Sequence, residues 1–99
     1  MVKIIEDRDG SILKAAVKLA EEVGFQWITR EAVAKAAGVA PGTVNNAFGT
    51  MPDLKRAVLR EAVAKGVLSI VAQGLADRHP IVMNAPEGIR RAAAAHMTV

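Results

Sequence analysis

The chain has 99 residues, a formal net charge of +3 at pH 7 and 52% apolar residues, which suits one small domain with a single hydrophobic core. It contains no cysteine, which excludes disulfides and thiolate metal sites, and no apolar run reaches the roughly 20 residues of a membrane-spanning helix. The N-terminus does not have the pattern of a signal peptide, so we expect a cytoplasmic protein with no membrane partner.

The composition favours helices over strands. Alanine is abundant and only 3% of the residues are aromatic, whereas strands prefer aromatic and β-branched residues. We therefore predict an all-α fold with five helices in one domain that covers residues 1–99. Its expected parts are an N-terminal arm (1–9), a three-helix unit (10–50) and two further helices (51–99).

The first predicted helix begins at Gly10 or Ser11 and ends at Val23, because apolar residues recur there at helical spacing. Gly24 follows the last periodic residue, where a left-handed residue often ends a helix. In the next connection we expect Trp27 to pack between the first and fourth helices rather than to stack on a base.

Residues 29–48 predict two short helices joined by a tight turn. Thr29 is a good N-cap, Gly38 lies where a helix commonly ends, and Pro41 is favoured at the first position of a new helix. The second of these helices has a polar face made of small or hydrogen-bonding residues: Gly42, Thr43, Asn45 and Asn46.

A helix–turn–helix of this kind can place its second helix in the major groove of DNA. Asparagine can pair bidentately with adenine, and threonine can bond a phosphate or a base edge. Alanine-rich helices joined through glycine also occur as scaffolds for protein contacts. We therefore keep two hypotheses, double-stranded DNA binding, which we favour, and a protein-interaction module.

Thr50 and Asp53 resemble a capping box, from which a fourth helix is predicted to continue to about Leu75. Nearly all of the second half of this helix is apolar, apart from a narrow polar stripe of Lys65, Ser69 and Gln73, which are spaced by four residues. Because a chain of this size cannot easily surround such a helix, we expect a second copy to cover it. The predicted dimer-interface residues are Val63, Val67, Leu68, Ile70, Val71 and Leu75.

Residues 77–80 should end the fourth helix, because Pro80 disfavours helix at the residue before it. Asn84 then predicts the N-cap of a fifth helix, which runs to about His96 and is expected at the same dimer interface.

The sequence predicts no catalytic residue, metal site or cofactor. His79 and His96 do not have the spacing of metal ligands, and Ser11 and Ser69 have no histidine at a spacing typical of nucleophilic catalysis.

Residues from about 8 to 58 resemble the N-terminal DNA-binding domain of the tetracycline-repressor (TetR) family. The residues that carry the resemblance are Ile12, Ala16, Leu19, Gly24, Phe25, Ile28, Thr29, Val33-Ala34, Ala37-Gly38-Val39, Gly42-Thr43-Val44, Phe48 and Leu54. The resemblance implies a homodimeric transcription repressor and not an enzyme.

The resemblance also implies which residues contact DNA. The start of the second helix would lie near a phosphate, the third helix would lie at the groove, and the N-terminal arm could reach a flank or the minor groove. The full expected set is Thr29, Arg30, Pro41, Gly42, Thr43, Asn45, Asn46, Lys55, Lys3 and Arg8.

The chain departs from the family pattern in two respects. Asn45 stands where the family usually has tyrosine, and Met51 stands where it usually has a phosphate-binding lysine. The part after the helix–turn–helix is also too short to enclose a ligand pocket of about 300–1,000 Å³. We therefore expect no small-molecule effector. A compact repressor of the kind found on phages and plasmids fits better than the alternative, a part of a longer regulator.

Overall fold

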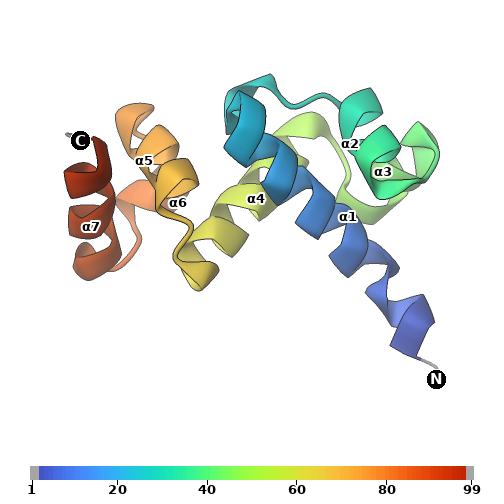
Figure 1. Cartoon of the computed structure of the whole chain (residues 1–99), viewed down its shortest axis with the longest axis horizontal. Coiled ribbons are helices and arrows are strands. Elements are labelled where there is room, and N and C mark those ends of the chain that lie inside the picture. The colour runs from blue at the N-terminus through green and yellow to red at the C-terminus, as the bar shows by residue number, and fades with distance from the viewer. Residues whose placement is uncertain (1–2, 98–99) are drawn as a thin grey trace.

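The computed structural model describes residues 3–97, with side chains from Arg8 to Met97. Within this range the fold is all-α, as predicted, but it has seven α-helices and one 3-10 helix instead of five helices. They are α1 (Lys3–Val23), η1 (Phe25–Trp27), α2 (Arg30–Ala37), α3 (Pro41–Phe48), α4 (Met51–Lys65), α5 (Leu68–Ala76), α6 (Pro80–Met83) and α7 (Glu87–Met97). Helices α2 and α3 lie at one end of the molecule and α5 to α7 at the other, with α4 running between them (Figure 1).

None of the helices in residues 3–97 combines the length and the apolar character that crossing a bilayer requires.

The first helix is longer than predicted. Residues 3–9 were expected to form an arm, but α1 already begins at Lys3. The end of α1 agrees with the prediction, since Gly24 has a φ of 97° directly after Val23.

The core of the N-terminal part of the chain forms around α1, α2, α3 and α4. Ile12, Ala16 and Ala20 recur every four residues on α1, and all three are fully buried. They belong to one cluster with buried residues of the other three helices: Val33, Ala34, Val44, Leu54 and Val58. The three-helix unit expected over residues 10–50 is therefore completed by α4.

The fourth helix ends earlier than predicted. Gly66 adopts a left-handed conformation with a φ of 69°, and its N–H donates to the Ala62 carbonyl oxygen. The Val67 N–H donates to the same oxygen, at 2.9 Å. Gly66 thus ends α4, whereas the predicted helix continued through this position to about Leu75. The predicted polar stripe is broken, since Lys65 ends α4 while Ser69 and Gln73 belong to α5.

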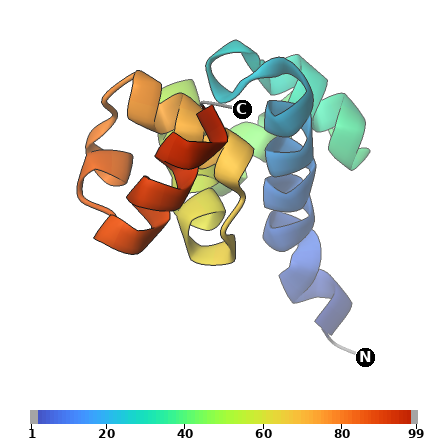
Figure 2. The same ribbon diagram turned by 60° about the vertical axis from the view of Figure 1, so that its left-hand side comes forward.

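The apolar helix α5 is covered from within the chain. It packs against α7, α4 and α6, and Figure 2 shows α5 and α7 side by side. Ile70 and Val71 are fully buried as a result. The sequence analysis argued that a second copy must cover Ile70 and Val71. That argument was wrong, because α7 of the same chain packs against α5. The other residues predicted at the dimer interface are only half-buried: Val63, Val67, Leu68 and Leu75.

The C-terminal helices hold the connection between α1 and α2. The Phe25 N–H donates to Gln73 Oε1 at 2.7 Å, and Gln26 Nε2 donates to Asp77 Oδ2 at 2.6 Å. The Phe25 ring also meets the His79 ring edge-on, with centroids 6.2 Å apart. These contacts fix η1, and therefore the entry into α2, against α5 and the turn that follows it.

Two expectations for single residues were wrong. Trp27 was expected to be packed between helices, but its side chain is 77% exposed, because Phe25 takes the inward position in η1. Asn84 was expected to start a helix, but it ends the short helix α6, and the next helix begins at Glu87.

His79 generates a prediction about pH. Its Nδ1 accepts from the Ile81 N–H at 3.2 Å, which caps α6. Burial lowers the pKa of His79 from its ordinary value near 6.5; Asp77 opposes this shift, and Arg56 and Arg60 add to it. Because the folded state prefers neutral His79, its contribution to stability is complete above pH 6.5 and is lost as the pH falls below that value.

We therefore expect the free energy of unfolding to fall between pH 7.5 and 5.5, measured by urea denaturation at each pH. His79→Asn keeps a capping side chain without a titrating group, so its stability should change less over the same range. An equal slope in both proteins would assign the pH dependence to another group.

Gly74 generates a prediction about packing. A Cβ at this position would lie 2.5 Å from Val82 Cγ2 and 3.1 Å from Leu59 Cδ2, and both neighbours are fully buried. Gly74→Ala should therefore lower the free energy of unfolding by about 1–3 kcal/mol. Gly88→Ala in α7 is the matched control: its Cβ would meet nothing within 4 Å, so it should be neutral or mildly stabilising. Thermal denaturation of both variants distinguishes these outcomes.

Candidate nucleic-acid interface

The turn between α2 and α3 has the geometry that the sequence predicted. Gly38 ends α2 in the left-handed conformation, with a φ of 73°. The Val39 N–H donates to the Ala34 carbonyl oxygen at 2.9 Å, which closes the turn. Pro41 occupies the first turn of α3. The angle between the two helices is therefore set by backbone hydrogen bonds and by Gly38, whose left-handed conformation glycine adopts without strain.

Helix α3 presents one face to the core and one to solvent. Val44 is 2% exposed and packs in the core, with Ala47 and Phe48 half-buried beside it. On the other face Asn45 and Asn46 are exposed, and neither makes a side-chain hydrogen bond within the described residues. The remaining predicted groove residues are also accessible: Pro41 and Gly42 are exposed, and Thr43 is half-buried.

The N-terminus of α3 has a property that the sequence prediction missed. Its N-cap residue is Ala40, which has no side-chain acceptor, so no side chain caps the helix. The first N–H groups of a helix carry partial positive charge and bind anions when nothing else satisfies them. The sequence contained a signal for this, because Ala40 directly precedes Pro41 and alanine is not among the residue types favoured at an N-cap. Pro41 has no N–H, and the Thr43 N–H donates to the Ala40 carbonyl oxygen at 2.9 Å, so the first turn of α3 offers the N–H of Gly42 to an anion.

The start of α2 carries two of the predicted contacts. Thr29 is the N-cap, as predicted, and its Oγ1 accepts from the Ala32 N–H at 3.1 Å. Arg30 is half-buried, and its Nε is buried without a hydrogen-bond partner in the described part of the chain. An unpaired buried donor costs roughly 1–3 kcal/mol, so this side chain is poised to gain from an acceptor.

The start of α4 confirms the predicted capping box. The Thr50 N–H donates to Asp53 Oδ2 at 3.0 Å, and the Asp53 N–H donates to Thr50 Oγ1 at 3.3 Å. Hydrogen bonds from Thr50, and then the guanidinium of Arg56, hold the pKa of Asp53 below its usual value. Lys55 is half-buried in this turn, and Met51, which replaces the usual lysine, packs against the core.

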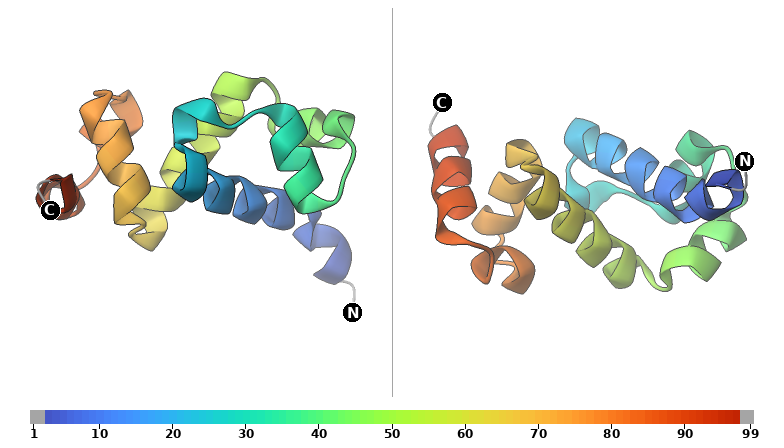
Figure 3. Two further views of the ribbon diagram at one scale, coloured as in Figure 1. Left: turned by 45° about the horizontal axis from the view of Figure 1, so that its top comes forward. Right: turned by 90° about the horizontal axis from the view of Figure 1, so that it is seen from below.

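The two remaining predicted contacts lie on α1. Arg8 is exposed, and its Nε lies 3.8 Å from Asp9 Oδ1, so it projects from a helix and not from an extended arm. The side chain of Lys3 lies outside the described residues. Figure 3 shows α2 and α3 at the same end of the molecule as the N-terminal end of α1. The predicted contacts on α2, α3 and the start of α4 belong to one end of the fold.

The sequence profile of a family described as "Bacterial regulatory proteins, tetR family" matches residues 12–58. Residues 12–58 form a tetR-family DNA-binding domain. Searches of curated proteins and of solved structures gave no significant match. The family is one of regulatory proteins and not of enzymes.

The tetR-family domain covers the chain from Ile12 in α1 to Val58 in α4. It therefore contains the whole helix–turn–helix and the first half of α4. All predicted DNA contacts from Thr29 to Lys55 fall inside it, while Lys3 and Arg8 precede it.

The uncapped start of α3 generates a prediction in which stability and binding change in opposite directions. Ala40 is exposed and extended, with φ and ψ of −76° and 151°, as an N-cap should be. Ala40→Asp should raise the free energy of unfolding by about 0.5–2 kcal/mol. It should weaken duplex binding by roughly 1 kcal/mol, about fivefold in Kd, because a carboxylate would face the DNA backbone.

Ala40→Ser is the control, since it caps the helix without adding charge and should retain most of the affinity. Chemical denaturation and fluorescence-anisotropy titration of a labelled duplex measure the two effects. Equal affinity for the two variants would show that no phosphate approaches the start of α3.

Proposed function

We propose that this protein is a sequence-specific, double-stranded-DNA-binding transcriptional regulator of the cytoplasm, which acts as a homodimeric repressor on a palindromic operator. The observation that supports it most directly is the exposed polar face of α3 within a tetR-family DNA-binding domain. Such a helix can lie in the major groove, where its exposed polar side chains reach the base edges. The net charge of +3 suits an anionic partner.

The proposed contacts are of two kinds: some residues read base edges, and others position the domain on the DNA backbone. Asn46 and Asn45 read base edges, because exposed amide groups can donate and accept at once. Pro41, Gly42 and the uncapped start of α3 allow the backbone to approach the DNA closely. The remaining residues position the domain on phosphates, and they are Thr29, Arg30, Thr43 and Lys55 on the domain and Lys3 and Arg8 at its N-terminal side.

The proposed dimer would read two half-sites about one helical turn apart, or a multiple of that. No effector is part of this proposal, so operator occupancy follows protein concentration. When a weak dimer assembles on DNA, binding is coupled to dimerisation and the titration curve is steeper than a single-site isotherm. This mode of control suits a compact regulator of the phage or plasmid kind.

The second candidate is a protein-interaction module built on the same scaffold. One observation favours it, since Trp27 is 77% exposed and Val23 is 47% exposed on the adjacent end of α1. Exposed tryptophan is enriched at protein interfaces. Salt dependence separates the two candidates: affinity for a duplex should fall steeply with salt if phosphates are neutralised, whereas an interaction module should bind no duplex at moderate salt.

The base-reading role generates a prediction for Asn46. Asn46→Ala should cost about 1–3 kcal/mol on the preferred duplex, first obtained by selection from a random pool, and should relax preference at one base pair. Asn84→Ala is the matched control, because Asn84 is an exposed asparagine that ends α6, outside the tetR-family domain. A uniform loss on all duplex sequences would instead assign Asn46 to backbone positioning.

A further inference from the structure

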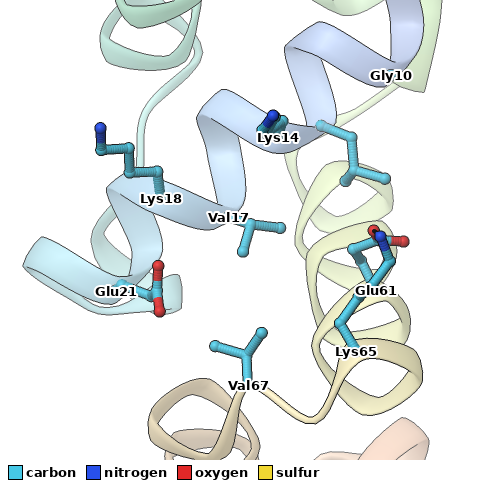
Figure 4. A pocket seen from close by; sticks show the side chains of 9 residues that line it. Gly10, Lys14, Val17, Lys18, Glu21, Glu61, Lys65 and Val67 are labelled. Atoms are coloured by element: carbon cyan, nitrogen blue, oxygen red, sulfur yellow. Dashed lines mark ion pairs between the residues drawn. The ribbon is translucent and has the colours of Figure 1, made fainter.

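A groove between α1 and α4 has no part in the function proposed above. Its volume is about 660 Å³. Leu13 and Val17 of α1 and Val67, just before α5, form its apolar floor, and all three are half-buried. Figure 4 shows Val17 and Val67 pointing toward one another across the groove. An apolar floor of this kind is stabilised when something covers it.

Charged side chains surround this floor. Lys14, Lys18 and Glu21 line it from α1. Glu61 and Lys65 line it from α4, where they pair with one another at 3.3 Å. The α4 side is therefore neutralised within the chain, whereas Lys14, Lys18 and Glu21 of α1 make no ion pair within the described residues.

The groove leaves the DNA-binding helices uncovered. Helix α2 lies against another edge of α1, where Ala36 shares a smaller cleft with Ala15, Leu19 and Glu22, and Lys18 borders both this cleft and the groove. Whatever occupies the groove at Val17 therefore does not have to displace α2. An occupant can remain in place while α3 contacts DNA.

The order of charges along α1 makes this surface complementary to itself. Lysines come first, at positions 14 and 18, and glutamate follows at position 21. When two copies of α1 pack antiparallel, each Lys14 faces Glu21 of the second copy, and the two-fold axis repeats the contact. The axis would then pass between residues 17 and 18. Val17 would meet its own copy close to the axis, while the exposed Lys18 has no acidic partner in this pairing and borders the cleft on the α2 side.

We propose that this groove is the dimer interface, occupied by α1 of a second copy in antiparallel orientation. This inference rests on the homodimer in the proposed function and names its surface. Val67 keeps the interface role that the sequence predicted, while the fully buried Ile70 and Val71 do not take part. A standard interface buries about 800 Å² per partner, a sizeable share of a chain that exposes 5994 Å². Pairing centred on one groove therefore gives a weak dimer that DNA binding reinforces.

Charge reversal tests the pairing. Glu21→Lys should raise the dimer dissociation constant on the order of tenfold, because two attractive contacts become repulsive. Lys14→Glu should have the same effect. The double variant restores complementarity and should recover most of the dimerisation. Sedimentation equilibrium without DNA gives the three constants, and Glu22→Lys is the control, since Glu22 is exposed on α1 but lies on the α2 side.

Cross-linking tests the two-fold axis. The chain has no cysteine, so Val17→Cys supplies a single thiol, and any disulfide that forms joins two chains. Such a bond requires Cα atoms about 4.4–6.8 Å apart, which antiparallel pairing centred near Val17 provides. Mild oxidation should give a covalent dimer that retains duplex binding, whereas Glu22→Cys should remain largely uncross-linked.

The outcomes separate this inference from the proposed function. A dimer that binds a palindromic duplex but responds equally to Glu21→Lys and Glu22→Lys would retain the function and overturn the interface. A dimer that follows the charge-reversal pattern but binds no duplex would retain the interface and overturn the proposed function. A chain that stays monomeric both free and on DNA would overturn the interface together with the proposed homodimer. Binding of a small amphipathic molecule in the groove of a monomer would overturn the interface.

Discussion

The left-handed turn at Gly66 determines how the rest of the chain is arranged. Without it, α4 would continue and the apolar residues after it would extend into solvent. With it, α5 folds back, so that Ile70 and Val71 are buried against other helices of the same chain. The same reversal brings Gln73 to the Phe25 N–H, which ties the C-terminal helices to the start of the helix–turn–helix. One glycine thus couples the two ends of the molecule.

The helix caps, starts and ends that depend only on neighbouring residues were predicted correctly from the sequence. The caps at Thr29 and Thr50, the end of α2 at Gly38 and the start of α3 at Pro41 all need only local hydrogen bonds or a fixed φ, and all were correct. These local signals also place the residues of α3 on their faces. For that reason the predicted groove residues are accessible in the structure, although their contact with DNA remains a prediction.

The errors concern choices that distant residues decide. A glycine such as Gly66 can lie within a helix or end it, and only the packing of α5 on α7 favours the second arrangement. Trp27 and Phe25 compete for one inward position. The Phe25 N–H donates to Gln73 Oε1, and the smaller ring of Phe25 is the one that is buried. The uncapped start of α3 was missed for a different reason: it depends on the absence of a hydrogen-bond acceptor from the side chain of Ala40.

The exposed side chain of Trp27 gives the protein a built-in optical reporter. It is the only tryptophan, it lies 77% exposed over Gly24, and it adjoins the turn that Gln73 and Asp77 hold in place. Indole emission depends on the polarity around the ring, so any loosening or covering of this junction changes a signal that comes from one known position. The native chain can thus report on the coupling between its two ends without a label.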